Sequence, residues 1–106
     1  MVNITDFRNI EICIGVIKEA LDHPNADKLY VLKVDLGDKE KQLVAGIKPS
    51  YLKESLVGKQ VVVIDNLEPA VIRGVESQGM LLAAHDEAGP VILTPERSVK
   101  PGSGVK

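Results

Sequence analysis

Residues 29–64 read LYVLKVDLGDKEKQLVAGIKPSYLKESLVGKQVVVI, and this stretch decides the fold. One face of its first part contains Tyr30, Leu32, Val34 and Leu36, which alternate with Val31, Lys33 and Asp35. A period of two is typical of a β-strand with one buried face. The turn-forming residues 37–40 lead into a second run at 42–47, so the pattern predicts a β-hairpin.

A single short helix is expected at residues 49–56, because Gly58 follows as a typical stop signal. Its buried stripe is expected to contain Tyr51, Leu52, Ser55 and Leu56. The next run, residues 61–64, consists only of Val and Ile and is too short for a helix. It therefore predicts a strand buried on both faces.

The flanking sequence extends the same pattern in both directions. Residues 3–8 are expected to form one helical turn, with Asn3 or Thr5 as its cap. In the following strand Ile10, Ile12, Ile14 and Val16 share one face, and Glu11, Cys13 and Gly15 share the other. Gly15 indicates a bulge or a bend, as small barrels need at their corners. Residues 22–27 predict a loop. Further short strands are expected near 71–75, 80–84 and 91–93.

Six or seven short strands with one helix between the third and fourth predict an all-β, closed Greek-key barrel. The OB-fold, a five-stranded barrel, has this plan, here with additional short strands. The length of 106 residues predicts a single domain, 1–106, large enough for a core. No signal-peptide pattern and no apolar run of about 20 residues is present, so a cytoplasmic location is expected.

Signatures of catalysis are missing from the chain. Gly74 and Gly79 have phosphate-loop spacing, but Met and Leu stand where that loop requires Lys and Ser or Thr. The lone Cys13 is expected to be a packed thiol, and turn chemistry explains His23 and His85 more simply than a metal does. We therefore expect no enzyme, no cofactor and no metal site.

Charge and aromatic content limit how this chain could bind nucleic acid. Its net charge is −2, which excludes a protein that coats nucleic acid through charge alone. Only Phe7, Tyr30 and Tyr51 are aromatic, and both tyrosines fall on apparent core faces. A groove for base stacking is therefore not expected. An RNA would be bound as a folded shape, through phosphates and 2′-hydroxyls.

Several segments together carry a specific resemblance. They are DFRNIEICIGVI (6–17), HPNADKLYVLKVDLG (23–37), VAGI (44–47) and GKQVVVIDNLEPAVIRGVESQGMLLAA (58–84). This set closely resembles the tRNA-binding domain of the endothelial-monocyte-activating-polypeptide type. That domain occurs at the C-terminus of many methionyl-tRNA synthetases and as a stand-alone protein, sometimes called the synthetase beta subunit. The resemblance implies a non-catalytic homodimer that binds tRNA by shape and backbone contacts and assists methionyl-tRNA synthetase, with no DNA or membrane partner.

The resemblance also implies RNA-binding residues: Lys28, Asn66, Arg73, Ser77 and Met80. Lys and Arg would pair with phosphates, the Asn and Ser side chains would donate to phosphate or ribose oxygens, and Met would give an adaptable apolar contact. Structural roles are open for four of them. Met80 could belong to the core, Asn66 could shape its turn, Ser77 could cap its own loop, and Lys28 could be an ordinary solvated side chain. Arg73 interrupts an apolar stretch without an obvious partner.

The chain departs from the family pattern at positions that are often basic. Cys13, Glu68, Ala70 and Val71 stand there, and the expected tRNA binding is correspondingly weak or conditional. Two alternatives follow. The domain could be a dimerisation or docking module of a synthetase with little RNA binding, or a chaperone-like peptide binder related to a secretion branch of the superfamily.

Overall fold

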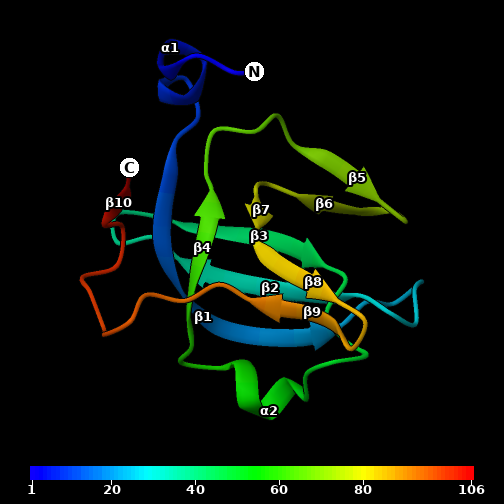
Figure 1. Cartoon of the computed structure of the whole chain (residues 1–106). Helices are drawn as coiled ribbons and strands as arrows, with labels where there is room; N and C mark the ends of the chain where they lie inside the picture. The colour runs from blue at the N-terminus through cyan, green and yellow to red at the C-terminus, as the bar shows by residue number, and fades with distance from the viewer.

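The body of the molecule is a curved antiparallel sheet built around one long strand, as the computed structural model of residues 1–106 shows (Figure 1). The early part of this strand pairs with β4 and the later part with β2, so it turns from one neighbour to the next. The sheet order is β3-β2-β1-β4-β7. Its members are β1 (Ile12–Asp22), β2 (Tyr30–Asp35), β3 (Glu40–Ala45), β4 (Gln60–Ile64) and β7 (Met80–Leu81).

Shorter elements surround this sheet. They are α1 (Ile4–Arg8), α2 (Lys53–Leu56), β5 (Ala70–Ile72), β6 (Val75–Ser77), β8 (Ala83–Asp86), β9 (Gly89–Ile92) and β10 (Gly104–Val105). β5 pairs with β6, β8 with β9, and β10 with the start of β1. The predicted all-β, OB-like barrel is confirmed, and α2 does lie between the third and fourth strands. The strand count is ten, because the expected C-terminal runs divide into hairpins and the tail adds a strand.

Gly15 allows the sharp path of β1. A Cβ atom at this position would overlap Val34 Cγ1 and would lie 2.7 Å from Leu36 Cδ2. Only a residue without a side chain lets β1 approach β2 so closely. The pairing register with β2 then shifts between Ile17 and Glu19, so the bulge lies a few residues after the glycine. The expected bend is confirmed.

The core contains the buried side chains of the barrel interior. They are Ile17, Tyr30, Leu32, Val34, Leu36, Leu43, Ala45, Ile47, Leu56, Val61, Val63 and Ile92. The alternation predicted for β2 is confirmed. In β1, Ile17 joins this cluster and Cys13 packs against it. On the other face Ile14 is also buried, whereas Ile10, before the strand, is exposed. The alternation in the sequence separates the two faces of a strand, but it does not show which face points into the barrel.

Two burial predictions were wrong. The helix is a single turn, so it buries only Leu56 completely; Leu52 is 74% exposed and Ser55 is also exposed. A four-residue helix presents too little surface for the four-residue stripe that was expected. In β4, Val61 and Val63 are fully buried, whereas Val62 and Ile64 are only half-buried. The outer face of that strand is therefore only partly covered.

The free edge of β3 is closed by side chains in place of a full strand pairing. The Val44 N–H donates to Ser77 Oγ at 3.0 Å, and the Gln42 N–H donates to Gln78 Oε1 at 2.8 Å. The Gln78 N–H returns a bond to the Gln42 carbonyl at 2.8 Å. These bonds fasten the end of the β5–β6 hairpin to β3. Neither helix of the structure is long and apolar enough to cross a membrane.

Replacing Gly15 with alanine tests the close approach of β1 to β2. The added methyl group must displace Val34 and Leu36, so the free energy of unfolding should fall by about 1–3 kcal/mol. Urea denaturation measures the change. Gly46→Ala is the matched control, because a Cβ there meets only Leu29 Cδ2 at an ordinary 3.6 Å. Equal effects of the two substitutions would contradict this account of the bend.

Candidate nucleic-acid interface

Two loops meet at one end of the barrel: residues 23–29, between β1 and β2, and the tip of the β5–β6 hairpin. His23 joins them and is only 5% exposed. Its Nε2 lies 2.9 Å from the Ile72 carbonyl, and its Nδ1 accepts the Asn25 N–H at 2.9 Å. Since Nδ1 is the acceptor, these partners assign the neutral ring with its proton on Nε2. The buried ring thus fixes the loop against the hairpin.

Asn25 and Arg73 form a reciprocal pair beside this histidine. The Asn25 side-chain amide donates to the Arg73 carbonyl at 3.0 Å, and Arg73 Nη2 donates to the Asn25 carbonyl at 3.1 Å. Arg73 is the one non-glycine residue with a positive φ, +52°, and Gly74 follows with a φ of +90°. A left-handed backbone costs a residue with a Cβ roughly 1–2 kcal/mol. The two bonds to Asn25 hold Arg73 in that conformation.

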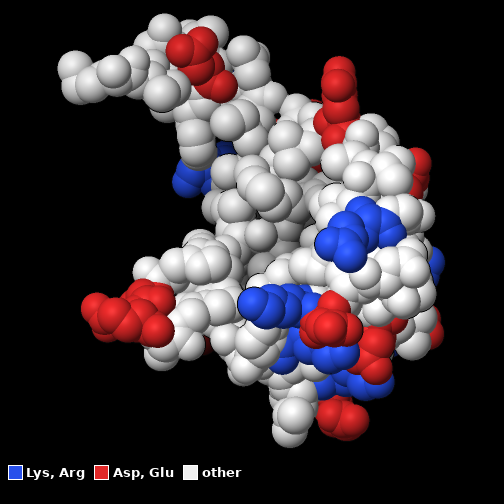
Figure 2. Space-filling view, turned by 90° about the vertical axis from the view of Figure 1, so that its right-hand side faces the viewer, with Lys and Arg blue, Asp and Glu red and all other residues white.

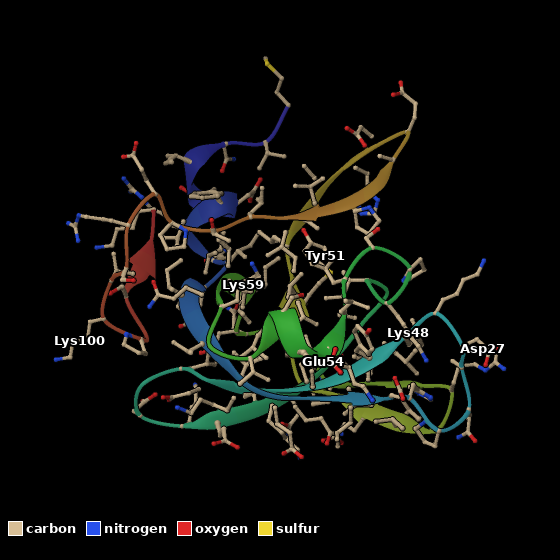
Figure 3. All side chains as sticks on the ribbon, turned by 90° about the horizontal axis from the view of Figure 1, so that it is seen from below. Asp27, Lys48, Tyr51, Glu54, Lys59 and Lys100 are labelled. Carbon is tan, nitrogen blue, oxygen red and sulfur yellow. The ribbon has the colours of Figure 1, made fainter.

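A polar cavity of about 430 Å³ opens between the two loops. It is lined by Asn25, Ala26, Asp27, Lys28, Leu29 and Arg73. Two of the sequence-predicted residues, Lys28 and Arg73, therefore share one site, and neither takes part in an ion pair within the protein. Figure 3 shows Asp27 at the outer edge of this loop and Lys48 on a neighbouring segment. The site offers two cationic groups to an anion, next to one carboxylate.

The lysines beside the cavity share a carboxylate partner. Lys48 and Lys53 both contact Asp22, at 3.2 and 3.0 Å. Hydrogen bonds from Lys53 and then from Lys48 lower the pKa of this exposed carboxyl below its ordinary value. Figure 2 views the side on which Figure 1 shows the two loops, and its basic groups are interspersed with acidic ones. An anion would therefore be bound by the local geometry of a few cations and not by a broad basic surface.

The other three predicted residues lie outside this cavity. Met80 is 46% exposed and lines a separate, mostly apolar cleft of about 390 Å³, together with Ile47 and His85. Asn66 joins the N-terminal segment to the end of β4: its Oδ1 accepts the Glu11 N–H at 2.8 Å, and its Nδ2 donates to the Asn9 carbonyl at 2.7 Å. Met80 is accessible to a ligand, whereas the polar atoms of Asn66 already have partners.

Ser77 is 4% exposed, and its hydroxyl makes two hydrogen bonds inside the protein. It accepts the Val44 N–H and donates to the Gly79 carbonyl, each at 3.0 Å. The position of Ser77 is that of a residue that supports the hairpin. His23 and Asn25 were missed as site residues. Their own turn chemistry was visible in the sequence, but nothing in it indicated partners 48 or 49 positions away.

Cys13 lies near the start of β1, whereas the candidate site lies beyond the end of that strand. Burial first, and the nearby Asp65 carboxylate second, raise the pKa of its thiol above the ordinary value.

Asp65 is partly buried, yet hydrogen bonds and charge from Lys41 and Lys39 outweigh the desolvation and lower its pKa. Lys41 Nζ lies 2.6 Å from Oδ1 and donates to the Asp65 carbonyl at 2.7 Å. No group of three or more His, Cys, Asp or Glu side chains is placed to hold a metal ion.

A family model described as "Putative tRNA binding domain" matches residues 12–104. The chain belongs to this family. The resemblance identified from the sequence is thereby confirmed, and the domain's two loops lie within the matched region.

Relatives of this tRNA-binding domain are methionine–tRNA ligases. Those of Thermococcus onnurineus and Thermococcus kodakarensis are 50% and 52% identical to it over 105 residues. The match covers 99% of this chain but 14% of each ligase. The methionine–tRNA ligase of Methanocaldococcus jannaschii is 47% identical over 106 residues, which are 99% of this chain and 16% of the ligase. The chain thus spans a small part of the length of these enzymes.

Solved structures match the tRNA-binding domain over its whole length. A MetRS-related protein from Pyrococcus horikoshii gives a TM-score of 0.92 at 33% identity, covering 100% of this chain and 98% of the other. The CsaA chaperone protein from Picrophilus torridus gives a TM-score of 0.93 at 33% identity, with both chains covered completely. The same fold therefore occurs in proteins named for two different roles.

Replacing Ser77 with alanine tests whether this residue fastens the hairpin to β3. The substitution leaves the part-buried Val44 N–H without an acceptor, so the free energy of unfolding should fall by about 1–2 kcal/mol. Ser55→Ala is the matched control, because the exposed Ser55 hydroxyl makes only a local bond to the Leu52 carbonyl. Chemical denaturation compares the two variants, and an unchanged midpoint for Ser77→Ala would show that the hairpin is held in another way.

Proposed function

We propose that this domain binds folded tRNA without catalysis, through contacts to the phosphate backbone. The observation that carries the proposal is the cavity in which Arg73 and Lys28 lie together, without ion-pair partners, in a member of a tRNA-binding family. The guanidinium of Arg73 suits a phosphate because its planar set of N–H donors can engage two oxygens at once. Lys28 adds a point charge beside it, and each such contact releases counterions from the RNA.

The remaining candidate residues take supporting roles in this proposal. Met80 lines an accessible apolar cleft and can contact a ribose or an unstacked base. Asn66 and Ser77, whose polar atoms bond within the protein, act on RNA mainly by holding their segments in place. To contact RNA directly, Asn66 would have to use the remaining lone pair of Oδ1 or the remaining proton of Nδ2. Ser77 would have to use the remaining lone pair of its hydroxyl.

The aromatic side chains support recognition by shape. The Tyr30 hydroxyl donates to the Tyr51 carbonyl at 2.6 Å, and the Tyr51 hydroxyl accepts the Ile92 N–H at 3.0 Å. Both rings are therefore engaged inside the barrel, and neither lines the cavity between the loops. Phe7, the remaining aromatic residue, is exposed on α1 and does not line this cavity either. Without a stacking platform at the cavity, the domain would follow the path of the RNA backbone and read little sequence.

Weak, salt-sensitive binding is part of the proposal. Glu68, Ala70 and Val71 are exposed on and before β5, next to the hairpin that carries Arg73. These are positions at which the family pattern is often basic, so this chain has fewer phosphate contacts to offer. A domain of this kind is most useful beside a catalytic partner, because tethering raises the local tRNA concentration. We propose methionyl-tRNA synthetase, in the cytoplasm, as that partner, since the relatives are methionine–tRNA ligases.

We further propose that the domain pairs with a second copy through its N-terminal segment. Figures 1 and 2 show this segment projecting from the barrel. No residue of α1 is buried, and Phe7, Ile4 and Ile10 are exposed. They line an open cavity of about 620 Å³ together with Val105 of β10. An exposed apolar patch of this kind is typical of an interface.

The tRNA proposal is tested by replacing Arg73 with alanine. Affinity for bulk folded tRNA should fall about tenfold, as expected for the loss of one charged contact. The slope of log affinity against log salt should become shallower by about 0.9 between 50 and 200 mM salt. Fluorescence anisotropy measures both, with an unstructured RNA of equal length alongside. Arg97→Ala is the matched control, because Arg97 bonds only its neighbour Ser98. Equal affinity of the wild type and Arg73→Ala for folded tRNA would exclude this site.

The pairing proposal is tested by Phe7→Asp. A charge within the apolar N-terminal patch should convert the dimer to a monomer, since burying an unpaired carboxylate is costly. Analytical ultracentrifugation reads the mass directly. Leu52→Asp is the matched control: it places the same charge on an exposed apolar residue at the start of α2, outside the N-terminal patch, and should leave the dimer intact. A wild-type domain that sediments as a monomer at micromolar concentration would end the pairing proposal.

A second function has a specific observation in its favour. The CsaA chaperone proteins from Bacillus anthracis and Picrophilus torridus match this structure with TM-scores of 0.92 and 0.93. The apolar cleft beside Met80 could receive a short apolar peptide segment. The anisotropy experiment separates the two functions when an unfolded polypeptide is titrated in parallel with the tRNA.

A further inference from the structure

We propose that His23 and Asn25 are positioning residues that set the conformation of Arg73 for phosphate binding. This inference rests on the proposed tRNA-binding function. Neither residue was among those that the family resemblance implied for RNA binding. Asn25 lines the cavity, and His23 does not. The proposal concerns how the cationic site is held in shape before RNA arrives.

The first step is the anchoring of the hairpin by His23. Its two ring nitrogens bond in different directions: Nδ1 to the Asn25 N–H, and Nε2 to the carbonyl of Ile72, the residue before Arg73. The ring is nearly inaccessible to solvent. One buried side chain therefore fixes both the turn of the loop and the backbone position from which Arg73 projects.

The second step concerns the turn that carries Arg73. Ile72 pairs with Val75, so Arg73 and Gly74 form a two-residue hairpin turn, and both have positive φ angles. This is the requirement of a type I′ turn, which strongly prefers Asn-Gly or Asp-Gly. Arginine is an unfavourable residue at its first position, and strain of this kind is concentrated at functional sites. The reciprocal bonds with Asn25 compensate for it.

The third step is the orientation of the guanidinium. Of its five N–H donors, one is used on the Asn25 carbonyl. The bond fixes the far end of a long side chain that would otherwise move freely, and it leaves the other donors for phosphate oxygens. Holding the group in this orientation lowers the entropy lost on binding. The acceptor is the main-chain carbonyl of Asn25, whereas the Asn25 side chain holds the Arg73 backbone, so residue 25 acts on Arg73 through both bonds.

A double-mutant cycle on the intact chain tests this dependence. Asn25→Ala keeps the main-chain carbonyl that accepts the guanidinium but removes the side-chain amide that holds the Arg73 backbone in its left-handed turn. The variant should weaken binding of folded tRNA about fivefold, because the turn that presents Arg73 gains freedom, and should leave the salt slope unchanged. Arg73→Ala should weaken binding about tenfold and make the slope shallower. Asn25→Ala/Arg73→Ala should match Arg73→Ala alone, because Asn25 has nothing left to position.

Gln60→Ala is the matched control. Gln60, the first residue of β4, makes two amide bonds to a distant backbone, at Val99, and it does not line the cavity between the loops. It should lower the melting temperature without changing tRNA affinity. Asn25→Ser is measured alongside, so that the cycle can be completed if the alanine variant unfolds.

The outcomes separate this inference from the function on which it rests. Additive losses in the double variant, or full affinity in Asn25→Ala while Arg73→Ala is impaired, would overturn the positioning role and leave the tRNA site intact. An unimpaired Arg73→Ala would instead remove the proposed site itself. A shallower salt slope for Asn25→Ala would show that Asn25 changes the number of phosphate contacts, which also overturns the inference.

Discussion

The position of the candidate site depends on how the free edge of β3 is satisfied. Unpaired backbone donors in a part-buried strand are costly, and no strand lies fully alongside this one. Ser77 and Gln78 supply the missing acceptors from their side chains. The two bonds hold the end of β6 against the barrel, and the β5–β6 hairpin extends from there toward the β1–β2 loop. A closure made for stability thus determines where Arg73 is presented.

The candidate site shows how an acidic chain can hold a local cationic centre. Four lysines are engaged in ion pairs: Lys48 and Lys53 share Asp22 near the site, and Lys39 and Lys41 share Asp65 farther away. The exposed pairs on Asp22 contribute little to stability, but they hold these two lysines away from other anions. Arg73 and Lys28 are left as the pair that an incoming phosphate would meet at the cavity. Geometry, and not net charge, would then decide where RNA binds.

Local patterns in the sequence predicted the elements well, and long-range contacts could not be predicted in the same way. The alternation in β2 and the place of α2 depend on neighbours in the chain, so both were correct. The inner face of β1 was not identifiable, because apolar residues occupy both faces and only the barrel's curvature selects Ile17. Ser77 was proposed from its match to the family motif, and its structural bond to Val44, 33 positions away, could not be predicted from the sequence. His23 was interpreted through its turn for the same reason, since a lone histidine gives no sign of Ile72.

The turn formed by Arg73 and Gly74 has a consequence for how this protein changes under selection. Asparagine at position 73 would suit the positive φ better, so a screen for heat resistance alone would favour it and would discard the guanidinium. Selection would keep arginine at this position only where the guanidinium contributes to function. In a lineage that no longer needs the cation, drift toward an Asn-Gly turn should come early, before the barrel core changes. The residue at this one turn could therefore serve as a sequence marker that distinguishes domains still in use from those kept as scaffolds.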